Sequence, residues 1–177
     1  MNLNAKMMAL LVAMGISGAA NAANTGSGTV TFTGAIIDAP CSINPNSVDQ
    51  TVNLGQISNA ELATDKNTGT STPQPFYIKL ENCTTATLKS VQSTFTGPKS
   101  LWDADSLGIN GSAEGASIIL KDGSGTKIKL GEKTTAQALQ DGNNTLSYSA
   151  YLQGGGSLAV IKPGNFQTVS NFTLSYQ

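Results

Sequence analysis

The residues that could carry out chemistry are few and of a narrow range of types. The chain contains no histidine and no arginine, and its ten basic residues are all lysines. Most hydrolase triads and zinc sites are therefore excluded, because histidine is the usual proton carrier near neutral pH and the commonest zinc ligand. Only 12% of the residues are charged and the net charge is −1, which leaves no basic stripe for nucleic-acid phosphates. No motif selects a Ser–Lys dyad or a pair of carboxylates, so we expect neither an enzyme nor a bound cofactor.

One spacing is similar to that of a calcium-binding loop. Asp103, Asp105, Gly108 and Glu114 occupy positions 1, 3, 6 and 12 of an EF-hand loop counted from Asp103. Position 5 is Leu107, which offers no side-chain oxygen, and the flanking segments have no helical periodicity. We therefore interpret this stretch as a polar surface loop and expect no metal site.

The first 22 residues have the three parts of a secretory signal peptide. Lys6 supplies the positive charge, residues 7–16 form an apolar run too short to span a bilayer, and residues 20–22 (ANA) form a cleavage site. A buried N-terminal helix is the alternative interpretation. We predict that residues 1–22 are removed on export and that the mature chain does not span a membrane, because no second long apolar stretch follows.

Export also determines how the two cysteines, Cys41 and Cys83, are interpreted. A single pair in an exported protein predicts one disulfide. This bridge would close a loop of 42 residues and contribute about 4 kcal/mol of stability on the chain-entropy model. A redox-active or metal-binding pair is the competing interpretation, but the cysteines lack CxxC spacing and there is no histidine partner.

Most of the remaining sequence alternates apolar and polar residues, as half-buried strands do. Such runs occur at residues 29–36, 51–54, 76–80, 146–152 and 172–176, and turns rich in Gly, Pro and Asn separate them. Helix signals are slight: Ser58 to Glu61 has a capping-box pattern, and residues 134–139 are a second candidate for a short helix. Together these features predict a single all-β domain built as a β-sandwich.

The two ends of the mature chain carry alternating segments whose partners the pattern does not identify. Residues 23–28 are small and polar, and they lead directly into the alternating run at 29–36. This run could be an ordinary first strand, or it could pair elsewhere by β-augmentation. The run at 172–176 could likewise be a plain edge strand of a complete sandwich.

In their order along the chain, these segments resemble the pilins of chaperone–usher (type 1-like) fimbriae of Gram-negative bacteria. The motifs that carry the resemblance are GTVTFTGAIIDAPC at 28–41, VDQTVNLG at 48–55, FYIKLENC at 76–83, NTLSYSAY at 144–151 and FTLSYQ at 172–177. Each motif alone is weak. Their order, combined with the export signal and the cysteine pair, makes the resemblance specific, and it covers essentially the whole mature chain.

The resemblance implies an incomplete immunoglobulin-like β-sandwich over residues 37–177 that lacks its last strand. It also implies that residues 23–36 are a donor-strand extension. In this family, a periplasmic chaperone first lends the missing strand, and the extension of the next subunit replaces it at the outer-membrane usher. The residues that would fill the groove of the neighbouring subunit are Val30, Phe32, Gly34 and Ile36.

The same resemblance implies that Phe172, Leu174 and Tyr176 line the acceptor groove, and that the chaperone binds the terminal carboxylate of Gln177. The expected function is that of a structural subunit that is exported through the periplasm and polymerises head to tail into a pilus rod at the cell surface, where it supports adhesion. The alternative is a secreted, monomeric carbohydrate-binding β-sandwich. Trp102 is the only tryptophan and the candidate surface aromatic for that function.

Overall fold

A computed structural model describes residues 26–36 and 39–177. The chain divides into two units between residues 36 and 37, and each unit is described by itself. The predicted signal peptide at residues 1–22 lies outside the described residues. Residues 26–36 are exposed to solvent and form no strand, so the strand predicted at 29–36 is absent from the isolated chain.

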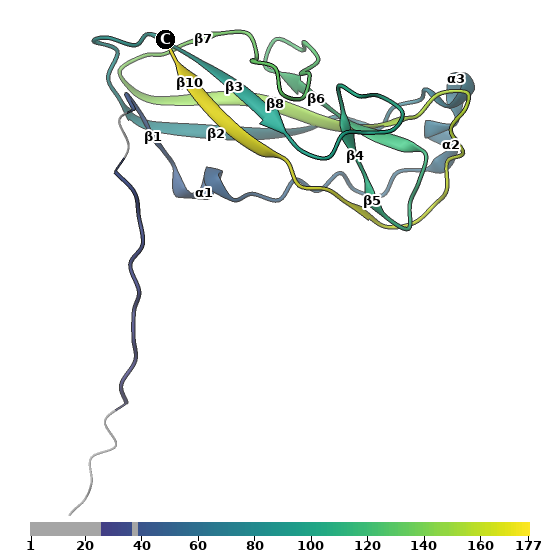
Figure 1. The fold of residues 1–177 in the computed structure, drawn as a ribbon, viewed down its shortest axis with the longest axis horizontal. Coiled ribbons are helices and arrows are strands. Elements are labelled where there is room, and N and C mark those ends of the chain that lie inside the picture. The colour runs from purple at the N-terminus through teal and green to yellow at the C-terminus, as the bar shows by residue number, and fades with distance from the viewer. Residues whose placement is uncertain (1–25, 37–38) are drawn as a thin grey trace, which may run out of the picture. The chain divides into compact units, whose positions relative to one another are not determined.

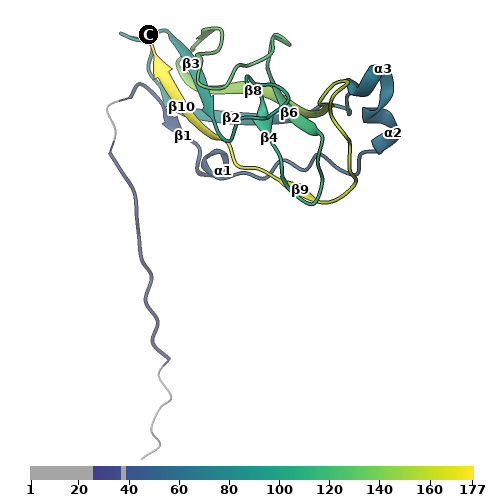
Figure 2. The same cartoon turned by 45° about the vertical axis from the view of Figure 1, so that its right-hand side comes forward.

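The second unit is built mainly of β-strands (Figures 1 and 2). Its strands are β1 (Ser42–Ile43), β2 (Gln74–Cys83), β3 (Ser90–Thr96), β4 (Leu107–Gly108), β5 (Asn110–Gly111), β6 (Ala116–Asp122), β7 (Gln137–Ala138), β8 (Gly142–Gly154), β9 (Phe166–Gln167) and β10 (Asn171–Tyr176). Its short helices are α1 (Pro45–Val48), α2 (Asn59–Leu62) and α3 (Thr64–Asn67). Among the described residues, no helix is long and apolar enough to cross a membrane.

The strands form two main sheets in which all pairings are antiparallel. One sheet has the order β1-β2-β8-β6-β4 and the other has the order β10-β3-β7, while β5 and β9 form a small ladder of their own. In the smaller sheet, Phe172 of β10 lies opposite Phe95 of β3. Among the described strands, β10 pairs only with β3, and none of them lies along its other edge.

The hydrophobic core lies between these two sheets. Alternation along β2 leaves Ile78 and Leu80 completely buried, because their side chains point to the inner face. The rings of Phe95 and Tyr148 pack edge to face at 5.1 Å, which joins β3 of one sheet to β8 of the other. The buried hydroxyls of Ser93 and Tyr148 hydrogen-bond to each other at 2.6 Å, which satisfies two polar groups inside the core. The predicted β-sandwich is thus confirmed.

The disulfide between Cys41 and Cys83 is present, as predicted. It joins the residue before β1 to the last residue of β2. The strands β1 and β2 are also paired neighbours in the first sheet. The register of β2 against β8 shifts between Leu80 and Cys83. Asn82 lies at this irregularity with φ 52°, a conformation that asparagine adopts more readily than most residues.

Three of the weaker predictions about local structure had different outcomes. Ser58 caps α2, since its Oγ accepts a hydrogen bond from the backbone N–H of Ala60 at 3.2 Å. The helix predicted at 134–139 is wrong, because Gln137 and Ala138 pair with β3 as strand β7. The strand predicted at 51–54 is also wrong, because the described chain places no partner strand beside this segment and a strand needs one.

Candidate functional site

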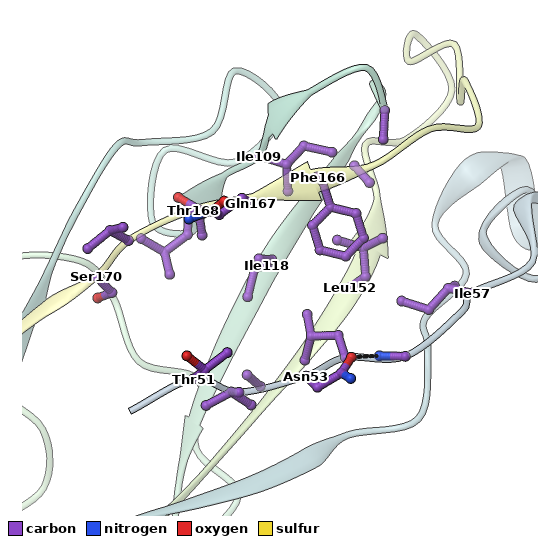
Figure 3. Close-up of a pocket in the computed structure, with 18 of the residues that line it drawn as sticks. Thr51, Asn53, Ile57, Ile109, Ile118, Leu152, Phe166, Gln167, Thr168 and Ser170 are labelled. Atoms are coloured by element: carbon purple, nitrogen blue, oxygen red, sulfur yellow. Dashed lines mark hydrogen bonds between the residues drawn. The ribbon is translucent and has the colours of Figure 1, made fainter. Parts of the chain in front are cut away.

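An open groove with a volume of about 1400 Å³ lies in the second unit. Residues 48–59 form its first wall, and residues 162–172 form its second wall. Figure 3 shows Thr51, Asn53 and Ile57 on the first wall, facing Phe166, Gln167 and Thr168 on the second. Small-molecule pockets usually have volumes of roughly 300–1,000 Å³, so this groove has room for a peptide segment.

The floor of the groove is the apolar core of the sandwich. Ile118 and Leu152 are buried, and Figure 3 shows them between the two walls. The half-buried apolar residues that line the groove and pack against the core are Ile43, Leu54, Ile57, Phe76, Ile109, Ile161, Phe166 and Phe172. Part of the apolar surface of these side chains is therefore exposed along the groove, which costs free energy in water.

The main chain of both walls has unused hydrogen-bonding capacity. From Thr51 to Ile57, no backbone group bonds to the backbone of another described residue, and the N–H of Gly55 bonds only to the side chain of Asn53 at 2.8 Å. On the second wall, β10 pairs with β3 on one side only. Unpaired backbone along an edge is a template for a further strand. A strand placed in the groove could thus bond to both walls.

The structure places the residues predicted for the last strand in different surroundings. Phe172 lines the groove. Leu174 and Tyr176 lie farther along β10, half-buried against the core and outside the groove lining. Burial raises the pKa of Tyr176 above its ordinary value of 10.0. Gln177 continues the ladder, since its carbonyl oxygen accepts a hydrogen bond from the backbone N–H of Ser90 at 2.8 Å.

The residues predicted to be donated lie in the first unit and face water. Val30, Phe32 and Ile36 have exposed fractions of 74%, 90% and 105%. Gly34 lies between them in the sequence, and a Cβ atom added to it would meet no described atom within 4 Å. Single exposed apolar residues are common, but a row of them on an unpaired segment is typical of a surface that binds another molecule.

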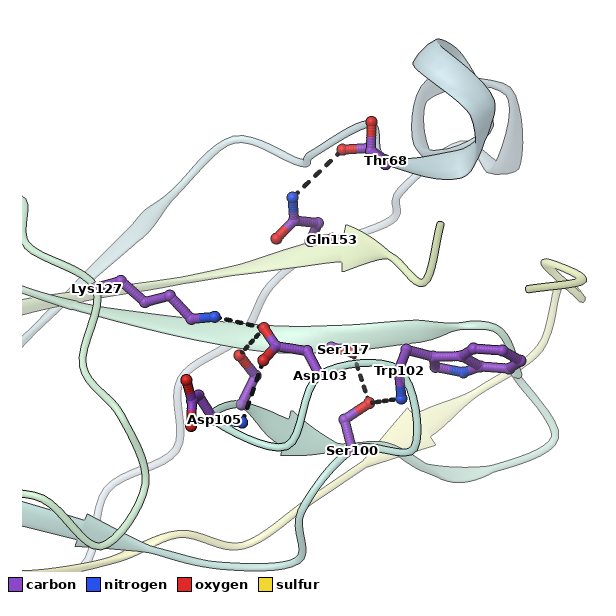
Figure 4. A network of polar contacts seen from close by, with 9 residues as sticks. Thr68, Ser100, Trp102, Asp103, Asp105, Ser117, Lys127 and Gln153 are labelled. Carbon is purple, nitrogen blue, oxygen red and sulfur yellow. Dashed lines mark hydrogen bonds and ion pairs between the residues drawn. The ribbon is translucent and has the colours of Figure 1, made fainter. Parts of the chain in front are cut away.

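Two carboxylates of the calcium-like pattern, those of Asp103 and Glu114, form ion pairs with lysines of the same chain. Asp103 accepts a hydrogen bond from Lys127 (Figure 4) and another from the hydroxyl of Ser106. Burial acts to raise the pKa of Asp103, but these donors outweigh it and hold the pKa below the ordinary value. Glu114 pairs with Lys162 at 2.6 Å. Within residues 26–36 and 39–177, no three His, Cys, Asp or Glu side chains are grouped as metal ligands would be.

Trp102, the candidate aromatic for carbohydrate binding, lies outside the groove lining. Its ring packs closely on Gly155, where an added Cβ would approach within 2.5 Å of the indole. Figure 4 shows this tryptophan beside Ser100, whose Oγ accepts a hydrogen bond from the Trp102 backbone N–H at 3.1 Å. The indole therefore has a local packing role outside the groove.

Sequence reasoning identified little of the groove itself. Leu54 belongs to the alternating run at 51–54, which predicts a paired strand and not one wall of an open groove. Phe166 follows Pro163, Gly164 and Asn165, a combination that predicts a turn. The only usable signal was the spacing of Phe166, Thr168, Ser170 and Phe172, which continues the alternation of β10 toward the N terminus.

An immunoglobulin-like sandwich with an open edge and an apolar groove defines a class of protein, the subunits of pilus rods. The chain belongs to the fimbrial protein family, whose model matches residues 30–177. It is 55% identical to the Fimbria A protein of Serratia marcescens over 100% of both chains. It is 50% identical to the Major MR/P fimbria protein of Proteus mirabilis (strain HI4320), over 96% of this chain and 97% of the relative.

A solved structure of a chaperone–usher pilus has the same fold. It shares 35% sequence identity with this chain at a TM-score of 0.74, and the match covers 86% of this chain and 96% of the pilus chain. The protein is accordingly a structural subunit of a pilus.

Proposed function

We propose that the chain polymerises head to tail, with residues 30–36 of one copy inserted as a strand into the groove of the next. The observation that carries this proposal is a match in pattern. The segment from Val30 to Ile36 spans about 20 Å when extended, as does the part of the second wall from Phe166 to Phe172. Both alternate with a period of two, so all inward positions on one can face inward positions on the other.

The inserted strand would supply what the isolated chain lacks. Its backbone would bond to the second wall at residues 166–172, where β10 begins, and to the unpaired first wall at residues 51–57. Its apolar residues would cover the floor, and each buried Val, Phe or Ile side chain contributes about 1.5–3 kcal/mol. The intervening Thr31 and Thr33 favour extended backbone and tolerate the outer, solvated face.

This contact joins one surface of a subunit to a different surface of the next. Such a head-to-tail interface leaves a free groove at one end and a free segment at the other, so it produces an open filament. In this scheme residues 1–22 are a removed signal peptide, residues 23–36 are the donated extension and residues 37–177 are the domain that accepts it. The filament would form the pilus rod and support adhesion at the cell surface, and we assign the subunit no catalytic role.

The empty groove also accounts for the proposed assembly partners. A subunit with exposed apolar core and unpaired edges is prone to aggregate before it polymerises. A periplasmic chaperone that lends a temporary strand would cover both features. An outer-membrane usher would then be the place where the strand of the next subunit replaces that of the chaperone, as in the chaperone–usher class to which the solved relative belongs.

The test compares the full chain with a variant that lacks residues 23–36, each coexpressed with a chaperone from a fimbrial operon. We expect both proteins to form a complex with the chaperone, because both contain the groove. Only the full chain should give filaments, because the shortened chain can accept a strand but cannot donate one. A full-length chain that folds alone, ignores the chaperone and stays monomeric would overturn the proposal.

A further inference from the structure

A second open strand edge, that of β2, faces the first wall of the groove. Among the described strands, β1 is the one that pairs with this edge, and it reaches only Leu80 and Glu81. Beyond β1, residues 74–77 of β2 face residues 50–53 across a hollow of about 370 Å³. Residues 51–54 alternate as a strand does, yet their backbone forms no hydrogen bond to the backbone of β2. Some feature of the molecule therefore prevents a pairing that the sequence pattern favours.

The backbone groups of β2 that point to the open edge can be identified from Lys79. Its carbonyl oxygen accepts a hydrogen bond from the N–H of Asn44 at 2.9 Å, and its N–H donates to Oγ of Ser47 at 3.0 Å. Neither partner belongs to β8, which lies on the other side of β2. Backbone groups alternate in direction along a strand, so those of Tyr77 and Pro75 point to the open edge as well.

The register of this edge shows what a continued strand would need. β1 pairs with β2 up to Ile43, and the four residues of α1 then interrupt the pairing. If the pairing resumed after α1 with these four residues as an insertion, Gln50 would lie opposite Tyr77. Val52 would then lie opposite Pro75. Residues that face each other in this way exchange two hydrogen bonds in an antiparallel ladder, so the two pairs would form four bonds.

Two of these four bonds are blocked. Pro75 has no N–H, so it cannot donate to the carbonyl of Val52. The carbonyl oxygen of Tyr77 already accepts a hydrogen bond from Nε2 of Gln50 at 3.1 Å, which takes the place of the main-chain N–H of the same residue. Nε2 of Gln50 also donates to the carbonyl of Ser47 at 3.2 Å, so both of its hydrogens are used. The proline removes no bond to β8, because its nitrogen points to the open edge.

We propose that Gln50 and Pro75 are positioning residues that keep the first wall of the groove from pairing with β2. Pairing would close the hollow and draw the wall toward β2, away from the second wall. Neighbouring strands lie about 4.8 Å apart, so a strand in the widened groove could bond to one wall but not to both. The inference rests on the proposed function, in which the inserted segment of the next copy needs both walls.

Hydrogen exchange in the chaperone-free, full-length subunit tests whether these residues hold the wall open. We expect Gln50→Val combined with Pro75→Thr to slow exchange of the Val52 and Tyr77 amides about five- to thirtyfold, as one or two further hydrogen bonds imply. The matched control is Gln50→Val combined with Gln74→Thr. It should slow exchange less, because it retains Pro75 and the backbone of Gln74 faces β8. Wild-type exchange in the first variant, or equal slowing in the control, would overturn the inference.

Pro75→Ala, which restores the N–H with a small side chain, provides a second test if the double variant does not fold. It should slow exchange of the same two amides, and an unchanged rate would again overturn the inference.

Filament growth tests the consequence for assembly. The subunit with Gln50→Val and Pro75→Thr should resist urea at least as well as wild type, because its wall gains hydrogen bonds, yet it should join into filaments about three- to tenfold more slowly. A purely structural role of the two residues predicts a less stable subunit instead. Lower stability, or joining at the wild-type rate, would overturn the inference. A wild-type chain that forms no filaments would overturn the proposed function, whereas the exchange rates would still decide whether Gln50 and Pro75 keep the wall unpaired.

Discussion

Replacing Phe32 by alanine separates the stability of the subunit from the stability of the filament. Phe32 is 90% exposed in the isolated chain, so the substitution removes almost no contact there, and surface changes of this kind usually alter the free energy of unfolding by less than about 0.5 kcal/mol. In the groove the same ring would be buried against the core. Loss of a buried phenylalanine costs about 3–5 kcal/mol, and each 1.4 kcal/mol is a factor of ten. The equilibrium constant for joining two subunits should therefore fall by between two and four orders of magnitude.

The assay measures both quantities on the same protein. Urea unfolding of the chaperone-free subunit measures the free energy of unfolding of the domain. Dissociation of preformed filaments in urea measures the stability of the contact between subunits. Thr31→Ala is the matched control, because Thr31 is adjacent but belongs to the opposite, solvated face of the inserted strand. Burial of Phe32 in the joint is contradicted if Phe32→Ala and Thr31→Ala filaments dissociate alike, or if Phe32→Ala destabilises the isolated domain by several kcal/mol.

Three further predictions concern other parts of the chain. Replacing Cys41 and Cys83 by serine should lower the free energy of unfolding by about 4 kcal/mol, given a closed loop of 42 residues, and an unchanged urea midpoint would contradict this. Burial acts to raise the pKa of Asp103 and of Asp122, but hydrogen-bond donors outweigh it and hold both values below the ordinary 3.8. Their charged forms therefore stabilise the fold above pH 3.8, and this contribution is lost as the pH falls through the lowered values. The urea midpoint should drop steeply in acid, and less so in Asp122→Asn, whereas equal acid sensitivity of the two proteins would count against the assignment. Gly34→Leu should fold and bind a chaperone normally but join subunits poorly, and a wild-type yield of filaments would show that the position accepts a side chain.

Local pattern was sufficient to predict the elements that find their partners inside the described chain. The alternating runs at 76–80, 146–152 and 172–176 lie within β2, β8 and β10. Each is half-buried and paired, so the period-two signal and the actual environment agree. The cap at Ser58 was predictable for a similar reason, because a capping hydroxyl and the N–H that it accepts from are two residues apart.

The helix predicted at 134–139 does not form, because strand pairing with β3 outweighs the local preference for a helix. Residues 137–138 lie against Ser90 and Val91, nearly fifty positions earlier in the chain, and no local pattern records that proximity. The groove was unpredictable for a related reason. Its floor is assembled from β2, β3, β6 and β8, so the position of Ile118 and Leu152 at this floor depends on how four strands distant in the sequence come together.

The two alternating runs that form no strand, at 29–36 and 51–54, have a common physical explanation. A β-strand is a property of a pair, and the alternation in a sequence shows only that one face is suited to burial. Both runs contain such a face, and neither has a partner among the described residues of the isolated chain. If residues 29–36 of one copy occupy the groove beside residues 51–54 of another, both failed strand predictions have the same cause. The partner that each strand needs then belongs to a different molecule. The alternation would then correctly indicate two strands of the filament, although neither strand forms in the isolated chain.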